Sequence, residues 1–262
     1  MMTLSLFHNY AEEFEKRLRI SSFPLAVKLL QNEKDIPGEA IRPKRDWGYH
    51  FSLCQGFAMS RREGSMIAML KEDMWCFEPV IGYGLAEPPQ YFLEGHNRFP
   101  ESAKTLEAGK NWAQAFPRLE IGKYIGIVSA PLRAASFEPD LVMIYCNPAQ
   151  LTQLLIAVNW IDGRDITCRI SGHAACVYSV VPVMQSGQCQ VTSPCRGDLG
   201  RAAASYYEML FTTPMAKVED LVIALKQLGE TLFRFPIIPT LKPEYKLLES
   251  YEKIGRMIGM EV

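Results

Sequence analysis

The sequence predicts an α/β or α+β protein in which helices lie on the faces of a mixed sheet. Short apolar runs alternate along the chain with longer segments of helical spacing. The 262 residues are near the upper limit that one hydrophobic core serves, and no Gly/Ser-rich linker divides them. We therefore expect a single domain over residues 1–262.

The first part of the chain has the clearest periodicity. Leu6, Tyr10, Phe14 and Leu18 recur at a spacing of four, which predicts an amphipathic helix ending near Arg19. The segments that follow predict a strand at 23–30, a loop at 33–48, a helix at 51–62 and a strand at 65–70. That second helix should stop at a glycine, residue 64.

Residues 76–100 are rich in glycine and proline and predict a long loop of the kind that often lines a functional site. Further helices are expected at 101–116, 149–160, 174–184, 218–233 and 244–257. Further strands are expected at 124–130, 141–145, 167–170, 189–193 and 206–212. The last two helices would form a C-terminal segment, 216–262.

Charge and hydropathy exclude several classes of protein. The formal net charge of −1 gives no general attraction to nucleic acid or to an anionic membrane. No run of about 18 apolar residues predicts a membrane span. The N-terminal segment has no export signal, so we expect the reducing cytoplasm. Seven cysteines in that compartment predict thiols or metal ligands rather than disulfides.

One cysteine pattern occurs twice. Cys54 lies near the start of a predicted helix, a strand follows, and the chain leaves that strand at Cys76, 22 residues later. Cys176 and Cys195 repeat the arrangement at a separation of 19 residues. This repeated pattern predicts an internal repeat in which two units are related by a pseudo-two-fold axis.

Two such units would bring four thiolates to one point. Four cysteines are the ligand set of a four-iron–four-sulfur cluster and of a structural zinc ion. Helix N-termini would favour the thiolate form. The alternative is that these cysteines are small buried core residues, because cysteine is often fully buried and no C-x-x-C pair is present.

Several segments resemble the family called domain of unknown function 169, or uncharacterised ArCR, over about residues 20–215. The segments that carry the resemblance are Leu53–Gly56, Met59–Gly64, Lys71–Cys76, Ile144–Leu151, Gly172–Cys176 and Pro194–Asp198. The family occurs in anaerobic bacteria and archaea and has no settled activity.

The resemblance implies that Cys54, Cys76 and Cys176 lie in the motif blocks of the family, which is consistent with an iron–sulfur role. Cys195 falls where members vary, so Cys189, six residues earlier, is the substitute for the fourth ligand. The remaining cysteines, Cys146 and Cys168, are expected in the core.

The resulting hypothesis is a protein that binds a 4Fe–4S cluster through Cys54, Cys76, Cys176 and Cys195, with zinc as the second choice of metal. The cluster would act in electron transfer, in redox sensing or as a Lewis acid, and would imply a redox partner protein. A homodimer is also expected, because the segments 233–239 and 257–260 are apolar.

Two other classes of function remain open. His173 precedes Cys176 by three residues, so the pair could form an activated thiol nucleophile in an enzyme. Alternatively, the chain could bind a small molecule in a pocket under the 76–100 loop, with the cysteines only packed in the core.

Overall fold

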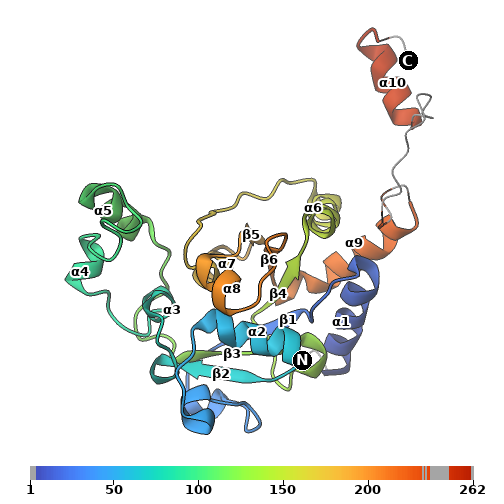
Figure 1. Cartoon of the computed structure of the whole chain (residues 1–262). Helices are drawn as coiled ribbons and strands as arrows, with labels where there is room; N and C mark the ends of the chain where they lie inside the picture. Colours follow the sequence, from blue (N-terminus) through green and yellow to red (C-terminus); the bar gives the residue numbers. More distant parts are fainter. Residues whose placement is uncertain (1–3, 232, 234, 237–247, 261–262) are drawn as a thin grey trace.

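The computed structural model describes residues 4–231, 233, 235–236 and 248–260 (Figure 1). It is an α+β fold in which helices cover both faces of a six-stranded sheet, as the sequence predicts. The strand order is β2-β3-β1-β4-β6-β5. The strands are β1 (Leu25–Leu30), β2 (Ile67–Leu70), β3 (Gly126–Pro131), β4 (Leu141–Cys146), β5 (Gln190–Thr192) and β6 (Met209–Pro214).

Every neighbouring pair of strands is antiparallel, whereas we expected a mixed sheet. A strand–helix–strand unit normally makes its two strands parallel neighbours. Here β1 and β2 do run parallel, since both are antiparallel to β3, but β3 is inserted between them. The unit is therefore a split βαβ motif, which leaves only antiparallel pairs in the sheet.

The two halves of the sheet have the same strand order. In each half the third strand lies between the first and the second, and the halves meet where β1 pairs antiparallel with β4. A two-fold internal repeat would produce this arrangement. The pseudo-two-fold relation between the halves stays a prediction.

One face of the sheet is covered by α1 (Leu4–Leu18), α6 (Pro148–Asp162) and α9 (Val218–Gly229). Phe14, Leu154 and Leu221 from these helices are fully buried. They belong to one core with Ala26 of β1 and Val142 of β4. Residues one position along each strand point to the opposite face, because side chains alternate along a strand.

The opposite face carries α2 (Leu53–Glu63) and α7 (Ala175–Ser186), with Phe57 and Val177 packed in a core that includes Val27 and Met143 of the sheet. The shorter helices on this side are α3 (Phe77–Gly82), α4 (Gln90–Leu93), α5 (Leu106–Ala115) and α8 (Arg196–Arg201). The last helix, α10 (Glu249–Met257), stands apart from the sheet and its helices (Figure 1).

Helix ends follow the local signals. Ser52 and Gln55 form a capping box at the start of α2, and Gly64 ends that helix with φ 78°. Asn147 caps α6, which begins with Pro148 at its first position.

The structure differs from the expectations at three places, and a fourth expectation falls partly outside the described residues. The 76–100 loop contains the short helices α3 and α4. The expected strand at 167–170 is irregular and lies along the edge of β5, where Cys168 accepts a hydrogen bond from the Val191 N–H at 3.2 Å. Helix α8 was not expected. Residues 244–247 of the last predicted helix, and most of the apolar segment 233–239, lie outside the described residues.

A buried ion pair ties the first half of the chain to the second. Arg61 of α2 is 1% exposed and its Nη1 lies 3.3 Å from the Glu208 carboxylate. Its guanidinium also lies over the Tyr145 ring, 4.0 Å from the centroid.

Within the described part of the chain, none of the helices has the length and apolar character needed to cross a membrane.

Candidate four-cysteine centre

The cysteines that the sequence singles out all lie at helix N-termini on the same face of the sheet. Cys54 is the second residue of α2 and Cys176 the second residue of α7. Cys76 is the N-cap of α3 and Cys195 the N-cap of α8. Each half of the chain thus supplies one cysteine inside a helix start and one cap that follows an edge strand.

Helix packing brings these starts together. Helix α2 packs against α8, and α3 packs against α7. A Cβ atom added at Gly197 would lie 3.3 Å from the Cys54 sulfur and 3.5 Å from the Cys195 sulfur, so both sulfurs border the same point. Gly82 of α3 allows α3 to pack closely against α7, because a Cβ atom at residue 82 would lie 2.6 Å from a methyl group of Val177.

The four thiols also interact electrostatically. Burial raises the pKa of the Cys176 thiol well above its usual range. Negative charge on Cys76, Cys54 or Cys195 would raise the pKa of Cys176 further. Cys54 and Cys176 are each 5% exposed, and Cys76 and Cys195 are half-buried.

Each of three sulfurs has a local polar partner. The Cys76 thiol donates to the Glu78 carboxylate at 2.9 Å, and the Cys195 thiol donates to Asp198 at 3.0 Å. Cys54 lies 3.1 Å from the Ser52 hydroxyl. In this conformation the described residues include no group of three or more His, Cys, Asp or Glu side chains arranged to hold a metal ion.

Backbone N–H groups at the helix starts oppose the effect of burial. Those of Gln55 and Glu78 lower the pKa of Cys54 and Cys76, and that of Ala175 lowers the pKa of Cys195. Such groups favour negative charge on sulfur.

Burial nevertheless outweighs these donors. It raises the pKa of Cys54 to about 12 and that of Cys195 to about 11, and the Asp198 carboxylate adds to both shifts. Burial and the neighbouring Glu78 raise the pKa of Cys76 still further. The thiols are therefore protonated at neutral pH unless a cation replaces their protons.

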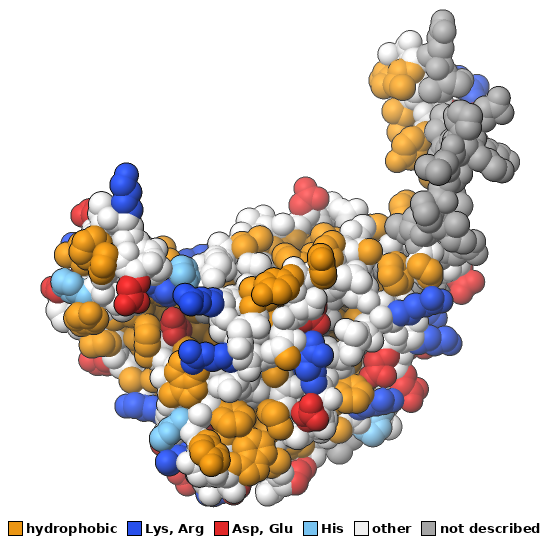
Figure 2. Space-filling model, viewed as in Figure 1, with side chains coloured by type: hydrophobic (Ala, Val, Ile, Leu, Met, Phe, Trp, Pro, Cys, Tyr) orange, Lys and Arg blue, Asp and Glu red, His pale blue; other side chains and the backbone are white. Residues whose placement is uncertain are grey.

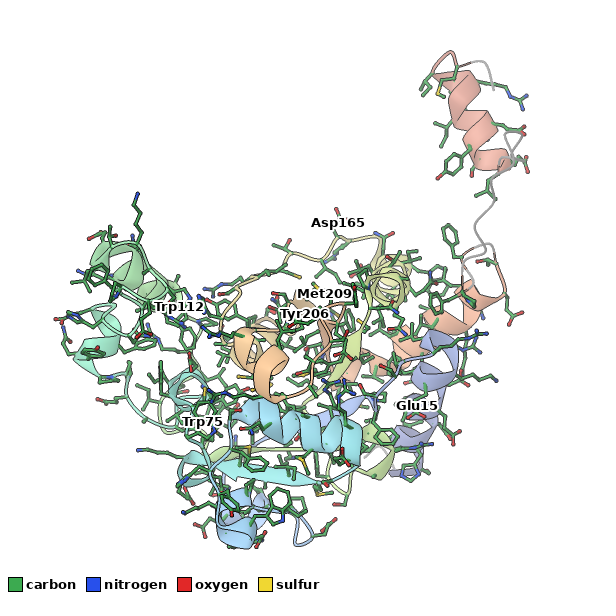
Figure 3. The ribbon with its side chains drawn as sticks, viewed as in Figure 1. Glu15, Trp75, Trp112, Asp165, Tyr206 and Met209 are labelled. Carbon is green, nitrogen blue, oxygen red and sulfur yellow. The ribbon has the colours of Figure 1, made fainter. Side chains whose placement is uncertain are left out.

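A buried arginine lies beside the thiols. Arg98 is 8% exposed and contacts His173 Nδ1 at 3.1 Å and the Glu78 carboxylate at 3.5 Å. Its guanidinium lies over the ring of Trp112 at 3.7 Å, on the side of α5 that faces α7 (Figure 3). Burial lowers the pKa of Arg98, and the charges of Glu78 and Cys76 oppose that shift.

Sequence reasoning missed Arg98 and Glu78 as members of this centre. Both residues belong to the 76–100 segment. The length of that segment was the one feature of the sequence that indicated a role in lining a site. Trp75, labelled in Figure 3, precedes Cys76 in the chain; its Nε1 donates to the Gln55 side chain at 3.3 Å, and the Arg201 guanidinium lies over its ring.

The other three cysteines lie elsewhere. Cys189 and Cys146 are buried in the core on the opposite face of the sheet, and Cys168 packs against that core. Cys189 donates to the Thr213 hydroxyl at 3.5 Å. The structure therefore places Cys195, and not Cys189, on the face of the other three cysteines, because the chain leaves β5 after Thr192 and Cys195 caps α8 on that face.

The described residues show no hydrogen bond between His173 and Cys176; His173 Nδ1 lies 3.1 Å from Arg98 Nη1 instead. The raised pKa of Cys176 does not favour a free thiolate nucleophile. The ring of His173 also has a lowered pKa, from burial and the nearby Arg98 charge.

The fold is of the α+β class, and four cysteines lie at helix N-termini on one face of its sheet. The sequence pattern of the family domain of unknown function 169, uncharacterised ArCR, matches residues 13–224. The chain belongs to this family, which confirms the resemblance seen in the sequence. No curated protein and no solved structure matches the chain.

Proposed function

We propose that this protein binds an iron–sulfur cluster through Cys54, Cys76, Cys176 and Cys195 and acts in a redox process. The observation that supports the proposal best is that the four cysteines lie at four separate helix starts on one face of the sheet, with the sulfurs of Cys54 and Cys195 bordering one point. When bound, a cluster would supply one-electron chemistry.

The chemical types of the four side chains suit the binding of an iron–sulfur cluster. Four thiols are available, and backbone N–H groups at the helix starts favour negative charge on three of the sulfurs, as suits cluster ligands. The raised pKa values mean that a metal must displace thiol protons. Glu78 and Asp198, which now accept hydrogen bonds from two thiols, lie where they can receive those protons.

The surroundings also suit a charged redox group. Arg98 places a buried positive charge near Cys76 and Cys195, which would balance the negative charge of a thiolate-bound cluster. The half-buried Cys76 lies between the exposed residues Trp75 and Phe77 in the chain, which leaves a short path to the surface for a redox partner protein.

The test is to purify the chain without oxygen and to measure visible absorption, iron and acid-labile sulfide on one sample. We expect a brown protein with about four irons per chain. Replacing each of Cys54, Cys76, Cys176 and Cys195 by serine should remove most of the iron and sulfide.

Cys189→Ser and Cys146→Ser are matched controls, because they remove buried thiols from the opposite face and should leave the iron unchanged. A colourless protein with neither iron nor sulfide after reconstitution would refute the cluster. Bound zinc in place of iron would indicate a structural metal site at the same four cysteines.

A further inference from the structure

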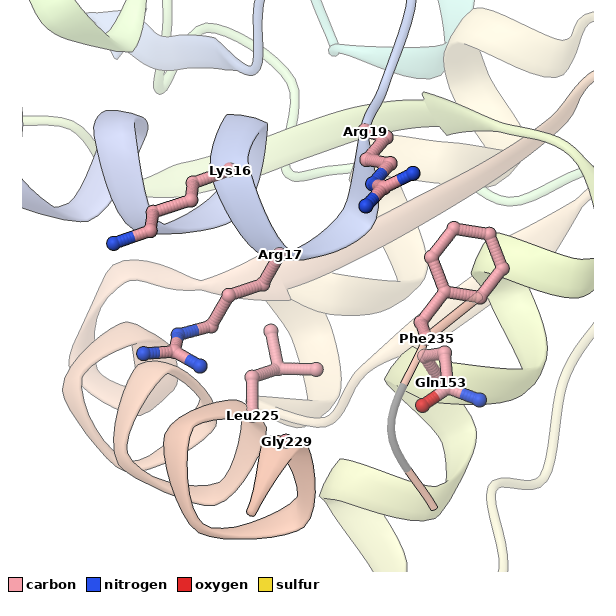
Figure 4. A pocket seen from close by; sticks show the side chains of 7 residues that line it. All are labelled: Lys16, Arg17, Arg19, Gln153, Leu225, Gly229 and Phe235. Atoms are coloured by element: carbon pink, nitrogen blue, oxygen red, sulfur yellow. The ribbon is translucent and has the colours of Figure 1, made fainter. Parts of the chain in front are cut away.

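A second candidate site lies on the opposite face of the sheet from the cysteines. It is a cavity of about 150 Å³ between α1, α6 and α9 (Figure 4). Its walls carry the cations Lys16, Arg17 and Arg19 and the amide of Gln153, and Leu225 and Phe235 form its apolar part.

The lining has an excess of positive charge. Arg17 is neutralised by Glu13, whose carboxylate lies 2.7 Å from Arg17 Nε and 3.3 Å from Lys226. Lys16 and Arg19 form no ion pair with any described residue, and no carboxylate lines the cavity there. Figure 2 shows basic side chains beside acidic ones over the part of the surface where α1 and the end of α9 lie.

A buried polar group points to a ligand. The side chain of Gln153 is 3% exposed, and its Nε2 has no hydrogen-bond partner among the described residues. One turn earlier on α6, the buried Gln150 is satisfied, because its Nε2 donates to the carbonyls of Leu18 and Arg19 at 3.0 and 2.9 Å. Leaving a buried amide donor unpaired costs free energy, so an acceptor bound in the cavity would remove that cost.

We propose that this cavity binds a small organic anion. Its phosphate or carboxylate group accepts hydrogen bonds from Arg19, Lys16 and Gln153 Nε2, which all supply donors. An attached apolar group packs against Leu225 and Phe235. The proposal does not depend on the cluster, because the two sites lie on opposite faces of the sheet.

The probe for the test is phenyl phosphate, with an anionic head and an apolar ring, titrated into the full chain by calorimetry. We expect one binding event per chain. Arg19→Asn should weaken the affinity by about tenfold or more, as expected for losing a charged hydrogen bond. Asparagine is chosen because residue 19 has φ 52° and asparagine tolerates this conformation.

Gln153→Met removes the unpaired donor at similar volume and should weaken binding by about fivefold. Lys104→Gln, an exposed cation near α5 at the other side of the molecule, is the matched control and should bind as the parent does. If Arg19→Asn does not fold, Lys16→Gln replaces it.

Three results would overturn the proposal: no heat of binding at millimolar phenyl phosphate, equal loss of affinity in Lys104→Gln, or unchanged affinity in both Arg19→Asn and Gln153→Met. Benzoate in a parallel titration separates the two head groups, and tighter binding of either probe with the same pattern across the variants supports the site.

Discussion

At the scale of residues, Arg98 is the charge that most distinguishes the cysteine centre from an ordinary buried cluster. Its positive charge interacts with Glu78, Cys76 and Cys195, and its contact with Trp112 holds it in place. A buried cation of this kind favours the more negative state of any group that the thiols bind.

This leads to a prediction that rests on the proposed cluster. Arg98→Gln should lower the reduction potential by an amount on the order of tens of millivolts, because the reduced cluster loses a nearby positive charge. Electrochemistry on the bound cluster measures the shift. Arg98→Lys keeps the charge and should restore most of the potential; an unchanged potential in Arg98→Gln would argue against a cluster near Cys76.

At the scale of elements, the centre depends on how closely α3 lies against α7. Gly82 sits at the end of α3, and a methyl group there would lie 2.6 and 2.8 Å from the two methyl groups of Val177. Alanine usually favours a helix over glycine, so local propensity and packing act in opposite directions at this position.

We predict that packing wins. Gly82→Ala should lower the free energy of unfolding by about 1–3 kcal/mol, as overpacked cores do, and should reduce the metal held per chain. Urea unfolding and a metal assay measure the two effects. Gly38→Ala is the control, because its Cβ would meet no atom within 4 Å; equal behaviour of both variants would contradict the packing argument.

At the scale of the whole molecule, the raised thiol pKa values make stability depend on pH. The thiols of Cys54 and Cys195 have an ordinary pKa of 9.0, and folding raises these values to about 12 and about 11. Above pH 9.0 the unfolded chain binds fewer protons than the folded chain, so the free energy of unfolding falls as the pH rises.

For the metal-free, reduced protein we therefore expect stability that is fully present below about pH 9 and is lost as the pH rises through about 11 to 12. Urea unfolding at about pH 8 and about pH 10.5 measures this loss. The buried hydroxyls of Tyr83 and Tyr145 also have raised pKa values and act in the same direction. The double variant Cys54→Ser, Cys195→Ser isolates the thiols, and a pH dependence identical to the parent would contradict their role.

The sequence by itself determined the elements whose signals are local. The apolar spacing of four predicted α1, and the position of Gly64 predicted the end of α2. It also placed Cys54 and Cys176 near helix starts, because caps, glycines and short apolar runs act over a few residues.

Only the tertiary structure decided what lies beside what. The insertion of β3 between β1 and β2 made the sheet antiparallel, and residues far apart in sequence set that choice. Cys189 and Cys195 are only six residues apart in the sequence, but they lie on opposite faces of the sheet. Arg98 reached the cysteines from a segment with no regular pattern. Such contacts depend on packing between distant segments, which no local window of sequence contains.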